Sequence, residues 1–100
     1  MVRGGFVYIL TNKNKTTLYT GVTADLQSRI YEHITRKNEN SFSTKYNLTI
    51  LVYYKFYPTI EEAIAEEKRI KAGNRKNKEK LINDLNPDWI DLYEFEVKHW

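Results

Sequence analysis

The chain has 100 residues, two histidines and no cysteine, and 41% of its residues are hydrophobic. This length fits one domain, and the lack of cysteine excludes disulfide scaffolds, thiolate zinc sites, iron–sulfur clusters and cysteine nucleophiles. The longest uncharged apolar stretch, residues 49–54, is too short to cross a bilayer, so we expect a cytoplasmic protein without a membrane partner.

Charge is distributed unevenly along the chain. Residues 1–83 carry 15 basic and 8 acidic side chains, whereas residues 84–100 carry five acidic side chains and one lysine. The basic side chains are densest between residues 68 and 80. A cluster of this kind suits the phosphate backbone of a nucleic acid, and a solvated helix face is the simpler alternative.

Three strands are predicted from runs of β-branched and aromatic residues. They lie at residues 6–10, 18–22 and 50–57, and a polar, asparagine-rich hairpin loop at 11–16 connects the first two. The third run is almost continuously apolar, which is typical of a central strand with both faces buried.

Helices are predicted in the remaining segments up to residue 85. Thr23 is the expected N-cap of a helix that ends near Arg36. Thr59 begins a second helix, and Gly73 is expected to end that helix in the left-handed conformation. Asn74 begins a third helix, which ends before the following Asn-Pro pair.

This order of elements predicts a single α+β domain. Its ββαβαα order indicates a three-stranded, mostly antiparallel sheet flanked by about three helices. Residues 1–86 form the predicted domain, within which residues 37–48 are expected to be a polar loop. Residues 87–100 form an aromatic and acidic tail, which we assign to the same domain without an expected secondary structure.

Glu67 interrupts the apolar face of the second predicted helix. The apolar residues of that face are Ile60, Ala63, Ile64 and Ile70. A buried carboxylate must be paired, neutralised or bound to a metal, because an unpaired buried charge is costly. The spacing alone favours an ion pair with Lys71, four residues later. The functional alternative is a ligand for a hard divalent cation, with water and substrate phosphate at its other positions.

Arg29 and His33 flank the apolar stripe of the first predicted helix, four residues apart. Arginine offers a permanent charge and a fork of donors that fits a phosphate, and histidine exchanges a proton near neutral pH. The structural alternative is a surface arginine, paired with Asp25 or Glu32, beside an amphipathic histidine.

Tyr8 and Tyr19 lie on the two strands of the predicted hairpin. Most tyrosines in strands are packing residues, so their positions alone favour a role in the core. Gly21 is more informative, because glycine weakens a strand and often marks a bulge or a place where another group approaches closely.

Together these segments resemble the GIY-YIG nuclease domain, and most closely its small stand-alone bacterial members. The resemblance covers residues 4–86 and rests on residues 7–10, 18–21, 29–33 and 66–71 together with Arg75. Phe6 stands where the first motif has its glycine, and Val22 stands where the repair-enzyme branch carries a lysine. An asparagine late in the domain assists in some members, and Asn83 and Asn86 are the candidates here.

The resemblance implies a role for each matched residue. Tyr8 matches the tyrosine of the first motif, and Tyr19 with Gly21 match the second. Arg29 matches the helical catalytic arginine, and His33 matches a histidine found in some branches.

The resemblance also implies a metal and a substrate. Glu67 matches the metal-binding glutamate, so Mg²⁺ or Mn²⁺ is the implied cofactor, and DNA, with RNA as an alternative, is the implied partner. The implied function is metal-dependent endonuclease hydrolysis of DNA in repair or recombination. The expected nucleic-acid contacts are Gly21, Lys68, Lys71, Arg75, Lys76 and Lys78.

Two other functions are compatible with the sequence. A non-catalytic nucleic-acid-binding module would use the same basic cluster, and a partner protein would supply the specificity that a separate targeting domain gives larger members. A protein-interaction domain would instead use the aromatic tail, residues 89–100.

Overall fold

The computed structural model describes residues 4–35 and 45–100. The elements, in chain order, are β1 (Gly5–Thr11), β2 (Leu18–Thr23), α1 (Leu26–Thr35), β3 (Ile50–Tyr57), α3 (Ile60–Ala72), α4 (Arg75–Leu85), α5 (Leu92–Phe95) and the 3-10 helix η1 (Val97–His99). The ββαβαα order and the α+β class predicted from the sequence are confirmed. The expected helix end near Arg36 and most of the expected loop lie outside the described residues.

The sheet has the order β2-β1-β3, and both pairs of strands are antiparallel. The central strand is therefore β1, and the prediction that the third strand is central was wrong. The continuous apolar run of β3 reflects burial on both faces: Leu51, Val52 and Tyr53 are all buried, although β3 forms an edge of the sheet. Covered faces and a central position produce the same hydrophobic pattern, so the pattern alone does not separate them.

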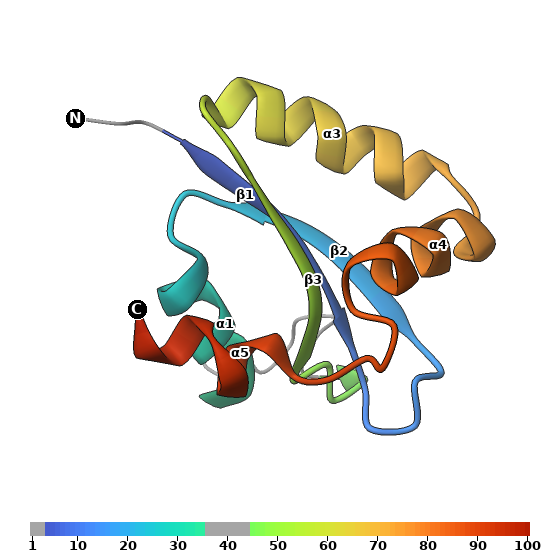
Figure 1. Ribbon diagram of the computed structural model, residues 1–100. Helices are drawn as coiled ribbons and strands as arrows, with labels where there is room; N and C mark the ends of the chain where they lie inside the picture. Colours follow the sequence, from blue (N-terminus) through green and yellow to red (C-terminus); the bar gives the residue numbers. More distant parts are fainter. Residues whose placement is uncertain (1–3, 36–44) are drawn as a thin grey trace.

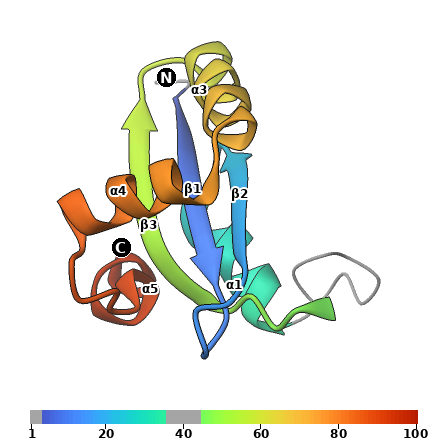
Figure 2. The same ribbon diagram turned by 90° about the vertical axis from the view of Figure 1, so that its right-hand side faces the viewer.

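Helices cover both faces of the sheet (Figures 1 and 2). On one face, α3 and α4 pack over a core cluster that includes Val7, Ile9 and Val52. On the other face, α1 and the C-terminal segment pack over a cluster that includes Tyr8 and Leu10. Since neighbouring residues of a strand point to opposite faces, β1 contributes alternately to the two clusters.

Two of the three predicted helix starts are confirmed. The side chain of Thr59 accepts a hydrogen bond from the amide of Glu62 at 3.2 Å, and that of Asn74 accepts one from the amide of Asn77 at 2.9 Å. At the start of α1, however, Asp25 rather than Thr23 accepts from a backbone amide inside the helix.

Two expectations for α3 were wrong. Gly73 does not adopt the left-handed conformation, because its backbone is extended, with φ −79° and ψ 168°, and leads directly into the N-cap of α4. Ile64, expected on the buried face of α3, is 37% exposed, whereas Ala63 and Ile70 are buried as predicted.

The C-terminal segment packs against the face that carries Tyr8. Leu92, Tyr93 and Val97 are buried in that core cluster. The side-chain amide of Gln27 in α1 lies 3.1 Å from the carbonyl oxygen of Val97 and makes similar contacts with the last turn of the chain. Every helix within the described residues is too short or too polar to span a membrane.

Candidate active site

Tyr8 and His33 form a buried hydrogen-bonded pair between the central strand and α1. Tyr8 is 1% exposed, and its hydroxyl oxygen lies 3.1 Å from Nε2 of His33. Burial raises the pKa of Tyr8 to about 12 and lowers the pKa of His33 to about 4. Both groups are therefore neutral at pH 7, and the phenol can donate its proton to Nε2 when that nitrogen carries none.

Arg29 joins this pair from the preceding turn of α1, since residues four apart share a helix face. Burial is the main influence on the pKa of Tyr8, and a hydrogen bond from Arg29 opposes it. The same hydrogen bond is the main reason that the pKa of Arg29 is raised. Arg29 also forms an ion pair with Glu32 at 3.1 Å, so the predicted surface pairing and the contact with the site occur together.

Gly21 provides the space that the phenol ring occupies. It lies directly across the sheet from Tyr8, and a Cβ atom at this position would lie 2.4 Å from the hydroxyl oxygen of Tyr8. Gly21 is thus explained by its contact with the candidate catalytic tyrosine, and its expected contact with nucleic acid stays a prediction.

Tyr19 completes a group of three rings. Its ring centre lies 6.3 Å from that of Tyr8 and 5.8 Å from that of His33. These separations are typical of packed aromatic pairs, so the three rings support one another. Tyr19 is the half-buried member of the group, at the edge of the sheet.

Glu67 brings a carboxylate to the same region from α3. Its side chain is 12% exposed, and Oε2 lies 2.9 Å from Nζ of Lys71. The ion pair expected from the spacing is therefore present. Nζ of Lys71 in turn lies 5.9 Å from the centre of the Tyr19 ring, which connects Glu67 to the aromatic group. The charge of Glu67 is the smallest of the influences that raise the pKa of Tyr8, after burial and Tyr19. Direct contacts thus join Tyr8, Tyr19, Arg29 and His33, and Glu67 is connected to this group through Lys71. Their catalytic roles stay a prediction.

A family model described as the GIY-YIG catalytic domain matches residues 4–80. The chain belongs to the GIY-YIG family. Its relatives include a UPF0213 protein of Staphylococcus haemolyticus, 33% identical over 79 residues, which are 79% of this chain and 94% of that protein. A UPF0213 protein of Staphylococcus epidermidis is 36% identical, with the same shares of both chains covered.

A solved structure supports the same assignment. The NMR structure of the UPF0213 protein BH0048 from Bacillus halodurans has a TM-score of 0.57 and 28% sequence identity, and the match covers 94% of this chain and 98% of that chain. The names of these relatives state no reaction, so the nuclease assignment is made through the GIY-YIG family as a whole.

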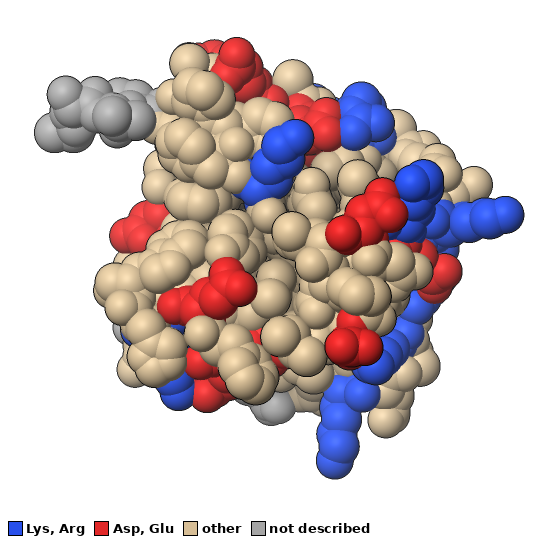
Figure 3. Space-filling view, in the orientation of Figure 1, with Lys and Arg blue, Asp and Glu red and all other residues tan. Residues whose placement is uncertain are grey.

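This GIY-YIG domain has its predicted basic cluster on the last turns of α3 and on α4, and Figure 3 shows basic side chains gathered on the side of the molecule that carries α4. Four of these cations are paired with acids of their own helix: Arg69 with Glu66, Lys71 with Glu67, Arg75 with Glu79 and Lys80 with Asp84. The sequence count therefore overstates the free positive charge. Such pairs are weak at the surface, so a phosphate can exchange with the acids.

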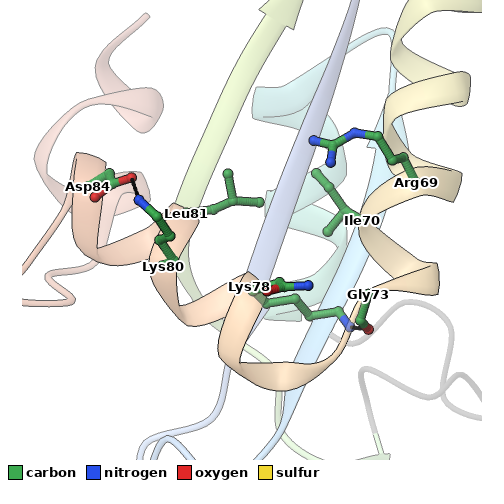
Figure 4. Close-up of a pocket in the computed structure, with 8 residues that line it drawn as sticks. Arg69, Ile70, Gly73, Lys78, Lys80, Leu81 and Asp84 are labelled. Carbon is green, nitrogen blue, oxygen red and sulfur yellow. Dashed lines mark hydrogen bonds and ion pairs between the residues drawn. The ribbon is translucent and has the colours of Figure 1, made fainter.

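A groove of about 250 Å³ separates α3 from α4 (Figure 4). Ile70 and Leu81 line its apolar part, and Arg69, Lys78 and Lys80 line its charged part. The ammonium group of Lys78 donates to the carbonyl oxygen of Gly73 at 2.8 Å, which connects α4 to the end of α3. The groove shares no lining residue with the group around Tyr8.

Arg75, an expected nucleic-acid contact, connects α4 to the hairpin. Its guanidinium donates to the backbone carbonyls of Lys15 at 2.7 Å and Thr16 at 2.9 Å. The sequence carried no sign of this contact, because the partners are main-chain atoms almost 60 residues away. Arg75 therefore has a structural role, and its role in binding nucleic acid stays a prediction.

The two candidate assisting asparagines are used elsewhere in the fold. Asn86 is buried, and its side-chain amide donates to the carbonyl oxygens of Val52 and Ile90. Asn83 accepts a hydrogen bond from the indole of Trp89 at 2.6 Å. Both therefore hold the C-terminal segment to the sheet and α4, and the assisting role expected from the resemblance stays a prediction for either residue.

Proposed function

We propose that this protein is a divalent-metal-dependent nuclease that hydrolyses phosphodiester bonds of DNA, with a role in repair or recombination. The observation that carries the proposal is the group of a phenol, an imidazole and a guanidinium from β1 and α1, to which a carboxylate of α3 is connected through Lys71 and Tyr19. Membership of a nuclease family gives the convergence a chemistry, and the basic surface of α4 supports a polyanionic substrate.

The residues present fit a hydrated divalent cation. Within the described residues, no three acidic or histidine side chains gather closely enough to enclose a metal ion. Glu67 is the candidate ligand that the family motif identifies, and Mg²⁺ commonly uses one or two carboxylates together with water and substrate phosphates. When bound there, Mg²⁺ or Mn²⁺ supplies positive charge that stabilises the phosphate in the transition state and lowers the pKa of nearby groups.

Tyr8 enters the reaction as a neutral phenol, because burial holds its pKa at about 12. We infer that its oxygen orients the attacking water, while Arg29 directs positive charge toward the same oxygen and the phosphate. The phenol oxygen would take a proton from the water while its own proton passes to Nε2 of His33, 3.1 Å away. Tyr19 supports the ring of Tyr8 from the edge of the sheet.

The burial of Tyr8 favours a second candidate function. Tyr8 is 1% exposed, so its hydroxyl group does not contact a bound nucleic acid in this conformation. The alternative is a nucleic-acid-binding module without catalysis, whose specificity comes from a protein partner. This module would bind DNA or RNA with the same affinity in the presence of a metal and in EDTA, and it would not cleave the nucleic acid.

The test is a cleavage assay on plasmid, single-stranded, branched and RNA substrates, with Mg²⁺, Mn²⁺ or EDTA. We expect cleavage by the wild-type protein only with a metal, and a loss of at least about a hundredfold in Glu67→Gln and Arg29→Ala. Glu61→Gln is the matched control, since Glu61 is an exposed acid of the same helix. Binding without cleavage on every substrate would establish the alternative, and unchanged cleavage by purified Glu67→Gln would refute the proposed site.

A further inference from the structure

The two members of the Glu67–Lys71 ion pair differ in their freedom. Their side chains are 12% and 50% exposed, respectively, and the two atoms that meet are 2.9 Å apart. The carboxylate is therefore largely shielded from solvent, whereas the ammonium group ends a flexible and half-exposed stem. Any change at this pair begins with a movement of Lys71.

The ammonium group has a second contact on the site side. Nζ of Lys71 lies 5.9 Å from the centre of the Tyr19 ring, within the range of a cation–π interaction. Lys71 therefore connects the carboxylate of α3 with the aromatic group of the hairpin. The neighbouring pair on α3 differs, since Arg69 is 66% exposed and lines the groove toward α4.

We propose that Lys71 is the resident counter-ion of Glu67, which a divalent cation must displace, and that the displaced ammonium group then contacts the substrate phosphate. The proposal rests on the proposed function, because it assumes that Glu67 binds the metal. A cation and an ammonium group repel each other at one carboxylate, so each weakens the binding of the other. After displacement, the ring of Tyr19 keeps the ammonium group close to the site.

This arrangement predicts coupling between metal and nucleic acid. Without nucleic acid, Lys71 competes with the metal for Glu67 and weakens metal binding. With nucleic acid, a phosphate takes the ammonium group, so the competition disappears and the two ligands favour each other. The sequence left the ion pair and the metal site as alternatives. In this proposal they are two states of Glu67, which is paired with Lys71 in one and bound to the metal in the other.

The experiment measures Mn²⁺ binding to the free, full-length protein, from the broadening of amide NMR signals around Glu67. We expect Lys71→Met to bind Mn²⁺ about two- to fivefold more tightly than wild type, the range expected from the loss of a partly exposed ion pair. Lys98→Met is the matched control. It also removes a lysine four residues after its glutamate partner, Glu94, but in the C-terminal segment, and its Mn²⁺ affinity at Glu67 should not change.

The outcomes separate this inference from the proposed function. If Glu67→Gln leaves Mn²⁺ binding unchanged, the metal site itself is wrong, and both proposals fall. If Glu67→Gln abolishes binding but Lys71→Met binds Mn²⁺ no more tightly than wild type, the displacement is wrong and the metal site stands. A short oligodeoxynucleotide should tighten Mn²⁺ binding in the wild type more than in Lys71→Met, and equal effects would also overturn the inference.

Discussion

His33 is kept neutral by the fold, and this makes stability depend on pH. Burial lowers its pKa from 6.5 to about 4, and the charge of Arg29 acts in the same direction. Between these two values the unfolded chain binds more protons than the folded one. The contribution of neutral His33 to the free energy of unfolding is therefore fully present above pH 6.5. It is lost as the pH is lowered toward 4, by on the order of 3 kcal/mol.

The prediction is tested by thermal and urea unfolding of wild type and His33→Gln from pH 7.5 to 4.5. Glutamine can place a polar group toward Tyr8 but does not titrate in this range, so the variant should lose much less stability on acidification. His99→Gln is the matched control, because His99 is exposed in η1, and it should follow the wild type. Parallel pH profiles of wild type and His33→Gln would show that His33 is not the titrating group.

At the scale of single elements, the accuracy of sequence prediction depended on how local the determining contact is. Thr59 and Asn74 were identified as N-caps because a cap is a contact over three residues. The conformation of Gly73 was predicted wrongly because α4 begins directly after it and keeps its backbone extended. The central strand was predicted wrongly because strand order depends on pairing between segments that are distant in the chain. The four-residue helix α5 is too short to have a periodic pattern, so no prediction was made for it.

Arg75 should stabilise the contact between α4 and the hairpin loop. Arg75→Lys keeps the charge but loses the fork that reaches two carbonyl oxygens, so we expect the free energy of unfolding to fall by about 1 kcal/mol. Hydrogen exchange of the loop amides, residues 12–17, should accelerate in the same variant. Arg69→Lys is the matched control, because Arg69 pairs within its own helix, and it should leave the loop unaffected.

At the scale of the whole molecule, the family motifs located the candidate site better than charge did. Tyr8, Arg29 and Glu67 were matched by their order in the chain; Arg29 contacts Tyr8 in the fold, and Glu67 is connected to the aromatic group through Lys71. The charge pattern was less informative, because it could not show that four cations of the basic cluster are paired within their helices. Pairing, burial and proton affinity depend on contacts between distant segments, which composition and spacing do not contain.

The C-terminal segment should unfold together with the sheet, as expected for one domain. Leu92 is 5% exposed and belongs to the same core cluster as Tyr8, so Leu92→Ala should lower the free energy of unfolding by about 2–4 kcal/mol. Phe95→Ala is the matched control from the same helix, and it should have little effect because Phe95 is 69% exposed.

Unfolding followed by fluorescence and by circular dichroism shows whether the C-terminal segment and the sheet unfold cooperatively. The two tryptophans, Trp89 and Trp100, report on the C-terminal segment by fluorescence, while circular dichroism is dominated by the longer helices α1, α3 and α4. In a single domain both signals change at one urea midpoint, and Leu92→Ala shifts that midpoint for both. A fluorescence transition at lower urea than the circular dichroism transition would show that the segment detaches first, and the site around Tyr8 would then lose part of its cover before the fold is lost.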